Sequence, residues 1–370
     1  MKVVLEDGFA IQKGTGVSQH TLNLFHYLRE VSEIDSAELV EKPFLSKVPS
    51  GALRRVLYIT WLNTSFQLFL KEKKPDIVHF TNYLIPIVRL CDVKYLATIH
   101  DLTAWRLPET VASVYLSYIK WAVSQAVKRA DLVLTVSEAV KREIIKLFGV
   151  HPGKIRTVYN LIGKNFWKLP KTAPDKIEAI KAKFGIKGDF LLFIGTIEQR
   201  KNLMTLIRAF EKVRDYRKLQ LVLVGKPGYG FSKVDRYLSD HRLKGEVILT
   251  GYVSEEEKIA LYDSATTFVY PSLYEGFGIP LVEAMVRKVP IVASRIPSTE
   301  EVAGEAALYY SGDPLNHETL AESILMLLEN ENLQQNLVKE GLKRAQEFSW
   351  EKVGKRYLQA YQEALDMDKL

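Results

Sequence analysis

Short apolar runs alternate along the whole chain with longer stretches of helical periodicity. In the first 160 residues the apolar runs predict strands at Lys2–Leu5, Asp76–Phe80, Tyr95–Ile99, Leu132–Val136 and Ile155–Val158. We expect helices between them, near residues 16–31, 51–72, 110–129 and 138–148. In the first of these helices, side chains recur every three or four residues, at Val17, Thr21, Leu24, Leu28 and Val31.

The second half of the chain repeats this scheme. Its apolar runs predict strands at Phe190–Ile194, Leu219–Val224, Val247–Thr250, Thr267–Tyr270, Ile291–Ala293 and Ala307–Tyr309. Helices are expected between these strands, and one of them begins with Ser254 and Glu257 at the spacing of a capping box. Three more helices are expected at the end of the chain, near residues 316–329, 333–347 and 350–365.

Apolar strands that alternate with helices are typical of parallel sheets covered on both faces. Two such runs predict an α/β fold of two Rossmann-like domains, over residues 1–162 and 163–348. A linker is expected near residues 160–177, where Gly163, Pro170 and Pro174 interrupt the periodicity. Residues 349–370 are expected to form a helix that packs back on the N-terminal domain. Ligands of open parallel sheets bind beyond the C-terminal ends of the strands, so candidate functional residues are sought there.

Composition narrows the class of protein. The chain has 370 residues, of which 47% are hydrophobic and 26% charged, as in soluble globular proteins. A single cysteine, Cys91, rules out an internal disulfide and fits a reducing compartment. The chain starts without the apolar region of a signal peptide and has no run of about 18 apolar residues, so a cytoplasmic location is expected.

The net charge of +7 is concentrated in the first 160 residues. A basic N-terminal half suits an anionic surface or a phosphate-bearing substrate, although ordinary solubilising charge explains it as well. Nucleic acid is not an expected partner, because the basic residues are scattered and no nucleic-acid-binding module is recognisable.

The segment from Glu275 to Glu283, EGFGIPLVE, carries the strongest chemical signal. Its two glycines, Gly276 and Gly278, allow the backbone to approach a ligand, and Pro280 suits the first turn of a helix. The free amides of such a helix start bind anions. Glutamates on either side can accept hydrogen bonds from sugar hydroxyls, so the segment predicts a diphosphate between two sugars. From spacing alone, a glycine-rich loop with two surface glutamates remains an alternative.

Together with the preceding YPSLY, this segment resembles the signature of family 4 of the retaining GT-B glycosyltransferases, and the resemblance extends over nearly the whole chain. It implies a GT-B fold, in which two Rossmann-like domains face one another across a cleft. It also implies that Glu283 binds the ribose hydroxyls of the nucleotide and that Glu275 contacts hydroxyls of the transferred sugar. The donor-binding backbone is then that of Phe277, Gly278 and Ile279, beside the sugar and diphosphate.

A second segment, GTIEQRKN, runs from Gly195 to Asn202 after a predicted strand. Arg200 and Lys201 can neutralise a diphosphate there, although a solvated charge pair is the alternative. The resemblance implies that this pair stabilises the departing nucleoside diphosphate. Many members of the family also have arginine directly after the glycine, where this chain has Thr196, so its diphosphate contacts are expected to be fewer or rearranged. The GTxExRKN form is most similar to bacterial mannosyltransferases.

Two shorter motifs follow strands of the N-terminal half. Gly14 and Gly16 flank Thr15 before the first helix, and the resemblance implies that this loop closes over the diphosphate. A short Gly-x-Gly is a weak signal by itself, and a simple tight turn is the alternative. His100 and Asp101 follow the strand Tyr95–Ile99; the resemblance implies that His100 reaches the donor sugar, often its 6-hydroxyl, and that Asp101 lies near the acceptor. A structural role for His100 is the alternative.

Two more residues are assigned by the resemblance. Ser137 matches a serine on the acceptor side of the same cleft, and a helix-capping role explains it equally well. Lys226, after the strand Leu219–Val224, borders the nucleotide base. Relatives often have an acidic residue at this position, which leaves the choice of base open.

The mechanism expected from these residues uses no metal and no other cofactor. Arg200, Lys201 and helix-start amides would stabilise the charge that develops on the leaving diphosphate. We find no well-placed protein nucleophile, so front-face attack with retention of configuration is expected, as the resemblance implies. Asp366-Met367-Asp368 matches an Asp-x-Asp metal motif, but it lies in the last five residues, where chain ends fray. The seven histidines show no zinc-ligand spacing either.

The expected partners are a nucleotide-sugar donor and a saccharide or lipid-linked saccharide acceptor. Residues 53–70 and 105–129 mix aromatic and basic side chains, which predicts either peripheral membrane contact through the N-terminal domain or ordinary helix core faces. The expected donor is GDP-mannose, and the expected process is surface-polysaccharide or lipid-linked oligosaccharide assembly. UDP-glucose and UDP-N-acetylglucosamine are alternative donors.

Two other classes of protein are weighed against this one. A Rossmann oxidoreductase would need a fuller Gly-x-Gly-x-x-Gly fingerprint than the chain contains. A non-catalytic two-lobed sugar-binding protein usually implies export, and the chain starts without a recognisable signal peptide.

Overall fold

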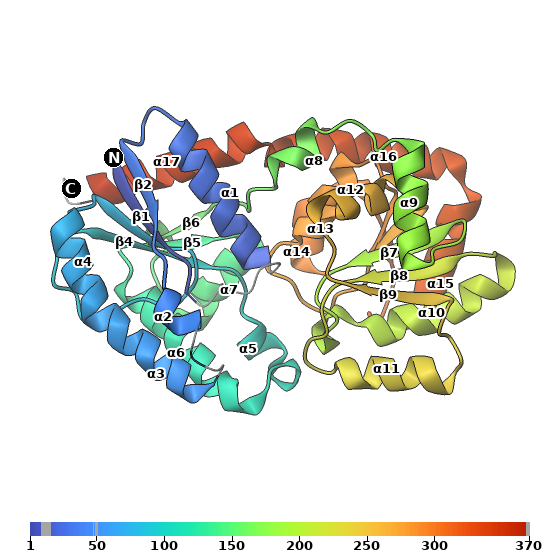
Figure 1. Ribbon diagram of the computed structural model, residues 1–370, viewed down its shortest axis with the longest axis horizontal. Helices are drawn as coiled ribbons and strands as arrows, with labels where there is room; N and C mark the ends of the chain where they lie inside the picture. The colour runs from blue at the N-terminus through green and yellow to red at the C-terminus, as the bar shows by residue number, and fades with distance from the viewer. Residues whose placement is uncertain (9–15, 47, 49–50, 368–370) are drawn as a thin grey trace. The chain divides into compact units, whose positions relative to one another are not determined.

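The computed structural model describes residues 1–8, 16–46, 48 and 51–367. Its contacts divide the chain into two compact units. Unit 1 comprises Met1–Leu102, Val114–Leu161 and Trp350–Leu370, and unit 2 comprises Thr103–Ser113 and Ile162–Ser349. Each unit is built around one parallel sheet with helices on both of its faces (Figure 1).

The sheet of unit 1 has the strand order β2-β1-β3-β4-β5-β6. Its strands are β1 (Lys2–Glu6), β2 (Ser36–Leu39), β3 (Ile77–Phe80), β4 (Lys94–Ile99), β5 (Leu132–Thr135) and β6 (Ile155–Thr157). The central register pairs Val3 of β1 with Ala37 on one side and Ile77 on the other. Strands β3 and β5 are buried along their whole length, as expected for a sheet covered on both faces.

The helices of unit 1 are α1 (Gly16–Glu30), α2 (Pro43–Ser46), α3 (Ala52–Asn63), α4 (Ser65–Lys73), α6 (Ser113–Arg129), α7 (Glu138–Phe148) and α17 (Trp350–Asp366), with one 3₁₀ turn, η2 (Pro152–Lys154). Helix α17 is amphipathic, and its apolar face presents Trp350, Val353, Tyr357, Tyr361 and Ala364. These side chains belong to the same buried cluster as residues of α1 and of four strands. Residues 350–366 therefore complete the core of unit 1.

Helices α1 and α17 approach each other closely at Gly354. A β-carbon at this position would collide with the ring of Tyr27 on α1. The absence of a side chain at Gly354 thus allows the two helices to pack together, and this contact helps to hold the end of the chain in unit 1.

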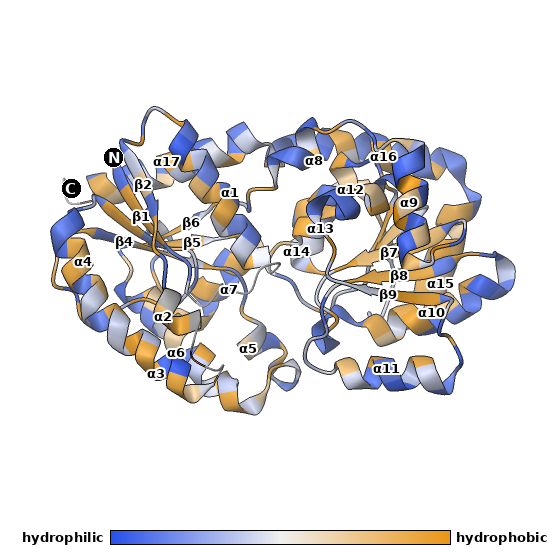
Figure 2. Cartoon of the chain, viewed as in Figure 1, coloured by the Kyte–Doolittle hydropathy of each residue, from blue (hydrophilic) through white to orange (hydrophobic). Residues whose placement is uncertain are grey.

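The sheet of unit 2 has the order β12-β11-β10-β7-β8-β9. Its strands are β7 (Phe190–Ile194), β8 (Gln220–Val224), β9 (Val247–Gly251), β10 (Thr267–Tyr270), β11 (Ile291–Ser294) and β12 (Ala307–Tyr310). Four of them, β7, β8, β10 and β11, are fully buried. The strands of both sheets are largely hydrophobic (Figure 2).

The helices of unit 2 are α5 (Thr103–Arg106), α8 (Lys164–Lys168), α9 (Pro174–Phe184), α10 (Leu203–Tyr216), α11 (Phe231–Asp240), α12 (Glu255–Ser264), α13 (Ile279–Val286), α14 (Pro297–Ala303), α15 (His317–Glu329) and α16 (Glu331–Ala345). Four 3₁₀ turns join them: η1 (Pro108–Thr110), η3 (Gln199–Lys201), η4 (Gly304–Ala306) and η5 (Gln346–Phe348). The predicted capping box of Ser254 and Glu257 is present at the start of α12.

The α/β fold and its two parallel sheets agree with the sequence prediction, but several details differ. The single helix expected near residues 51–72 is divided into α3 and α4, with a break at Thr64. Strand β2 was not predicted, because it is a four-residue edge strand without a continuous apolar run. The predicted linker contains α8 and the start of α9, since Pro174 initiates a helix instead of interrupting one. The division by contacts also differs from the predicted boundaries in grouping Thr103–Ser113 with unit 2.

Candidate active site

The sheet of unit 2 reverses its strand order next to β7, which has β8 on one side and β10 on the other. In open parallel sheets, ligands bind at such a switch point, beyond the C-terminal ends of the strands. The loops after β7 and β10 meet there: the Leu273 amide donates to the Arg200 carbonyl at 2.9 Å, and the Asn202 side chain donates to the Pro271 carbonyl at 3.2 Å. Two segments that are about 70 residues apart in the sequence are thereby joined.

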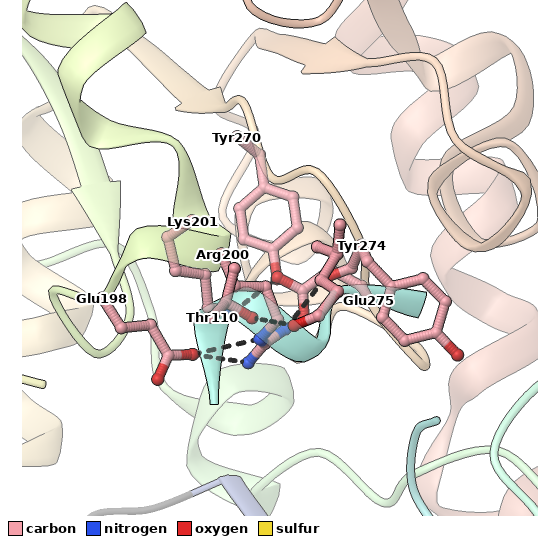
Figure 3. Close-up of polar contacts among 8 residues, drawn as sticks. Thr110, Glu198, Arg200, Lys201, Tyr270, Tyr274 and Glu275 are labelled. Carbon is pink, nitrogen blue, oxygen red and sulfur yellow. Dashed lines mark hydrogen bonds and ion pairs between the residues drawn. The ribbon is translucent and has the colours of Figure 1, made fainter. Parts of the chain in front are cut away.

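Three of the predicted catalytic residues form one buried ion cluster at this point (Figure 3). Arg200 Nη1 lies 2.6 Å from Glu275 Oε2, and Lys201 Nζ lies 2.5 Å from Glu275 Oε1. The side chains of Arg200, Lys201 and Glu275 are only 16%, 9% and 8% exposed. A second hydrogen bond from Arg200 Nη1 to the Tyr274 carbonyl, at 2.9 Å, fixes the guanidinium.

The charge of Glu275 is set by two opposing effects. Burial raises the pKa of its carboxyl group, but the neighbouring Arg200 and Lys201 cations outweigh burial and lower the pKa to about 2. Glu275 is therefore ionised at neutral pH and can only accept hydrogen bonds. Each of its oxygens receives one bond from a cation, and the Tyr270 hydroxyl is a further hydrogen-bond partner of this carboxylate.

Glu198 is a member of this cluster to which the sequence analysis gave no role. Its Oε1 accepts hydrogen bonds from Arg200 Nη2 at 2.7 Å and Nε at 3.1 Å. The two cations, Arg200 and Lys201, are thus balanced by two carboxylates, Glu198 and Glu275. The position of Glu198 in the motif GTIEQRKN, two residues before Arg200, was the signal that would have identified it.

Glu283 projects from the first turns of α13 into a second buried site. Lys258 Nζ of α12 lies 2.5 Å from Glu283 Oε1, and the Tyr262 hydroxyl donates to Oε2 at 3.0 Å. Lys258 in turn lies 4.7 Å from the centre of the Phe166 ring. Lys258 and Tyr262 fix the direction of the Glu283 carboxylate and were not predicted; their spacing of four residues on one helix was the only sequence signal.

The start of α13 has the backbone that the glycine pattern predicted. Gly278 has a φ of 104°, a conformation that side chains disfavour, and no side chain caps the helix. Pro280 occupies the first turn. Phe277 is buried against the ring of Phe348, and Ile279 begins the helix. This start presents backbone rather than side chains, as an anion site requires.

Lys226 lies beside the same edge of the sheet. Its carbonyl accepts the amide of Ile197 at 2.9 Å, which ties the loop after β8 to the loop after β7. Its side chain is exposed and lies 5.0 Å from the centre of the Tyr252 ring.

The remaining predicted residues belong to unit 1. His100 follows β4, and its Nε2 lies 2.8 Å from the carbonyl oxygen of Thr81. Because a carbonyl only accepts, Nε2 carries the proton and Nδ1 of the neutral ring is an acceptor. Burial lowers the pKa of His100, which favours this neutral form. Asp101 is half-buried next to it.

Ser137 is fully buried and caps α7, accepting the amide of Val140 at 3.1 Å. This is the capping role considered in the sequence analysis.

Gly16 is the first residue of α1, whereas Gly14 lies outside the described residues. The structure thus brings together Arg200, Lys201 and Glu275 in unit 2, and it places His100, Asp101 and Ser137 in unit 1.

Two searches for other kinds of site concern only the described part of the chain. Within it, no group of three or more His, Cys, Asp or Glu side chains is arranged to hold a metal ion. Asp366, from the dismissed Asp-x-Asp motif, is the last residue of α17, rather than lying beyond the final helix as expected. Over the same residues, every helix is too short or too polar to cross a membrane.

Two family models match the chain. Residues 176–344 match the model for glycosyl transferases group 1, and residues 15–163 match the model for glycosyltransferase family 4. O-antigen chain mannosyltransferase B of Escherichia coli is 31% identical to this chain, over 94% of this chain and 96% of the relative. The O-antigen chain mannosyltransferase RfbU of Salmonella typhimurium is 28% identical, over 82% of this chain and 84% of the relative.

Solved structures are similar over nearly the whole chain. Sucrose-phosphate synthase of Thermosynechococcus elongatus has a TM-score of 0.79 at 18% identity, covering 99% of this chain and all of that chain. Anabaena Alr3699/HepE, crystallised with UDP-glucose, has a TM-score of 0.77 at 17% identity, covering 98% of this chain and all of that chain. These similarities confirm the predicted GT-B fold.

The geometry around Glu283 generates a prediction for nucleotide binding. Tyr262→Phe removes a hydrogen bond to the Glu283 carboxylate without changing charge, so we expect nucleoside diphosphate binding to weaken about tenfold. Isothermal titration with GDP and UDP measures this effect. Tyr310→Phe is the matched control, because the Tyr310 hydroxyl is bonded to the Pro314 carbonyl at 3.0 Å. Equal affinities for the two variants would contradict the assigned role of Tyr262.

Proposed function

The chain belongs to the group 1 and family 4 glycosyltransferases, and from this premise we propose that it transfers mannose from GDP-mannose to a saccharide or lipid-linked saccharide acceptor. Three relatives with mannosyltransferase names support this donor, and one of them matches over nearly the full length of both chains. Two of the three are named for the O-antigen chain, so we place the reaction in surface-polysaccharide assembly.

The observation that carries the proposed chemistry is the pair of cations at the switch point of unit 2. Breaking the bond between the anomeric carbon and the phosphate oxygen transfers negative charge to the leaving diphosphate. Arg200 and Lys201 are rigidly held and almost buried, so their attraction for that charge is weakly screened. The diphosphate would replace Glu198 as a partner of Arg200. With two cations and helix-start amides in this place, the reaction needs no metal ion.

Glu275 and Glu283 would orient the donor on either side of the diphosphate. A pKa of about 2 keeps Glu275 ionised, so it can hold sugar hydroxyls but has no proton to donate. Its bonds to two cations also make its oxygens poor nucleophiles. We therefore propose front-face attack with retention of configuration, in which a phosphate oxygen of the donor takes the acceptor proton. We assign the ribose hydroxyls to Glu283 and a hydroxyl of the donor sugar to His100.

A UDP-sugar is the second candidate donor. It is favoured by the similarity in fold to Alr3699/HepE, whose structure contains UDP-glucose. The exposed position of Lys226 beside the proposed base site leaves both bases compatible with the loop.

We also propose that unit 1 touches an anionic membrane surface. Neither α3 nor α6 contains an acidic residue, and together they carry Arg54, Arg55, Lys120, Lys128 and Arg129. Leu53, Val56 and Val114 on these helices are 63%, 59% and 69% exposed. The Arg55 guanidinium lies 4.4 Å from the centre of the Tyr115 ring, which joins the two helices. Exposed apolar side chains among cations suit a layer of anionic lipid headgroups.

Residues 53–70, the first of the two segments that mix aromatic and basic side chains, are therefore divided in their roles. Tyr58 and Phe66 are fully buried in the core, whereas Leu53 and Val56 are exposed. The apolar positions at the solvent side of α3, rather than its aromatic residues, form the proposed lipid contact.

The donor proposal is tested by turnover of GDP-mannose, UDP-glucose and UDP-N-acetylglucosamine in parallel, in the presence of EDTA. We expect release of GDP only, and we expect Glu283→Ala and Arg200→Ala to reduce it about a hundredfold, since each removes a charged contact to the donor. Arg295→Ala is the control, because Arg295 is an exposed residue of unit 2 that pairs with Glu300. Turnover that requires a divalent metal would contradict the metal-independent mechanism. Release of UDP alone would contradict GDP-mannose as the donor.

The membrane proposal is tested by flotation with phosphatidylcholine vesicles that contain or lack phosphatidylglycerol. We expect binding only to the anionic vesicles, weakened by salt and reduced severalfold by the double substitution Leu53→Glu and Val56→Glu. Tyr216→Glu, at a 78% exposed position of unit 2, is the matched control. Equal binding of the double variant and the control would refute the role of α3.

A further inference from the structure

Three histidines from separate elements lie together in unit 1. His20 is on α1, His79 is on β3 and His100 follows β4, and the first two are completely buried. The rings of His20 and His100 pack edge to face, with centroids 5.5 Å apart and an interplanar angle of 74°. The side chain of His20 is thus part of the surface against which His100 rests.

Two tyrosines of α17 reach into this group. The Tyr357 hydroxyl lies 3.1 Å from His20 Nε2, and the Tyr361 hydroxyl lies 2.8 Å from His79 Nδ1. Both tyrosines are fully buried and lie one helical turn apart. They are equivalent in burial and chemistry, but their hydroxyls are bonded to different histidines, although the Tyr357 ring also packs against the His79 ring, with centroids 6.0 Å apart.

The hydrogen bonds of His20 determine which of its ring nitrogens carries the proton. The amide of Leu161 points to His20 Nδ1 at 3.4 Å, so Nδ1 is the acceptor and Nε2 carries the proton. His20 therefore donates to the Tyr357 hydroxyl, whose own proton is directed to the Tyr159 carbonyl at 3.5 Å. Burial is the main cause that lowers the pKa of His20, followed by the neighbouring His100 and His79 rings, and this favours the neutral tautomer.

His100 is held from two sides. Its Nε2 donates to the Thr81 carbonyl, and Thr81 is itself fixed by bonds to the Glu6 carbonyl and to the Thr21 hydroxyl, at 2.8 and 2.7 Å. The ring of His20 supplies the other support. With Nε2 occupied, Nδ1 is the atom of His100 that remains to accept a hydrogen bond from a ligand hydroxyl.

We propose that Tyr357 is a positioning residue for the reaction: it fixes the orientation of His20, whose ring in turn holds His100 with Nδ1 directed to its ligand. The C-terminal helix thereby sets the geometry of a residue at the end of β4, more than 250 positions earlier in the sequence. The effect on turnover rests on the proposed function, in which His100 contacts the donor sugar.

Tyr361 provides the comparison that separates positioning from simple stabilisation. Its partner His79 bonds the Thr98 hydroxyl at 2.7 Å, and the backbone of Thr98 is already fixed by its ladder to Leu134. Loss of the Tyr361 hydroxyl should therefore cost stability as loss of the Tyr357 hydroxyl does, but without moving His100.

The test compares Tyr357→Phe with Tyr361→Phe. We expect Tyr357→Phe to lower kcat about tenfold, since small misplacements of a substrate-orienting group are costly, and Tyr361→Phe to remain within about twofold of the unmodified protein. GDP binding should be unchanged in both. On a His100→Ala background, Tyr357→Phe should have no further effect on kcat. Equal loss in the two tyrosine variants, or an undiminished effect on the His100→Ala background, would overturn the proposal.

A second readout does not depend on turnover. The imidazole nitrogen resonances of ¹⁵N-histidine-labelled protein report the tautomer and surroundings of each of the seven histidines. Tyr357→Phe should shift the resonances of both His20 and His100, whereas Tyr361→Phe should shift that of His79 and leave His100 unchanged. An unmoved His100 resonance in Tyr357→Phe refutes the positioning. If the His100 resonance moves in Tyr357→Phe but the unmodified protein turns over no donor, the proposed function is refuted instead of the positioning.

If Tyr357→Phe does not fold, His20→Gln addresses the same link. Its amide can still donate to the Tyr357 hydroxyl, but it lacks the ring that supports His100. We expect it to lower kcat as Tyr357→Phe would, with GDP binding unchanged, and full activity would overturn the proposal.

Discussion

The candidate site depends on one buried electrostatic arrangement, in which Glu275 is held between Arg200 and Lys201. Burying these charges would be unfavourable if any of them were unpaired. Because each is paired, two cations can be kept almost out of solvent at the switch point of a parallel sheet. The same pairing keeps Glu275 ionised. A diphosphate carries several negative charges and can replace a carboxylate as the partner of a cation. Cations that are paired with carboxylates in the protein are therefore well suited to bind it.

The fold supplies the conditions for this cluster. Strand β7 lies between β10 and β8. Because β7 and β10 are neighbours in the sheet, the loops that follow them meet, and residues distant in sequence share one site. Helix α13 then carries Glu283 to a point where Lys258 and Tyr262 fix it. In unit 1, α17 completes the core and reaches the histidines beside the ends of β3 and β4. In both units, residues that we propose to contact the donor are held by buried partners on other elements.

Some of these strands and site residues could be predicted from the sequence and others could not, for physical reasons. Buried strands are continuous apolar runs, so most were found, whereas the edge strand β2 is half-polar and was missed. Arg200, Lys201, Glu275 and Glu283 could be proposed as site residues because their chemistry is concentrated in two short segments. Lys258, Tyr262, His20 and Tyr357 act through tertiary contacts, and neither spacing nor residue type distinguishes them from ordinary helix residues. Glu198 lies within a recognised motif, but its role becomes evident only from its contact with Arg200.

The most direct test of the central claim is a crystal structure of the protein with GDP. We expect phosphate oxygens to lie within hydrogen-bonding distance of Arg200 and Lys201, the contact between Arg200 and Glu198 to be opened, and the ribose hydroxyls to bond to Glu283. A nucleotide bound without phosphate contacts to either cation, with Arg200 still paired to Glu198 and Glu275, would contradict the central claim.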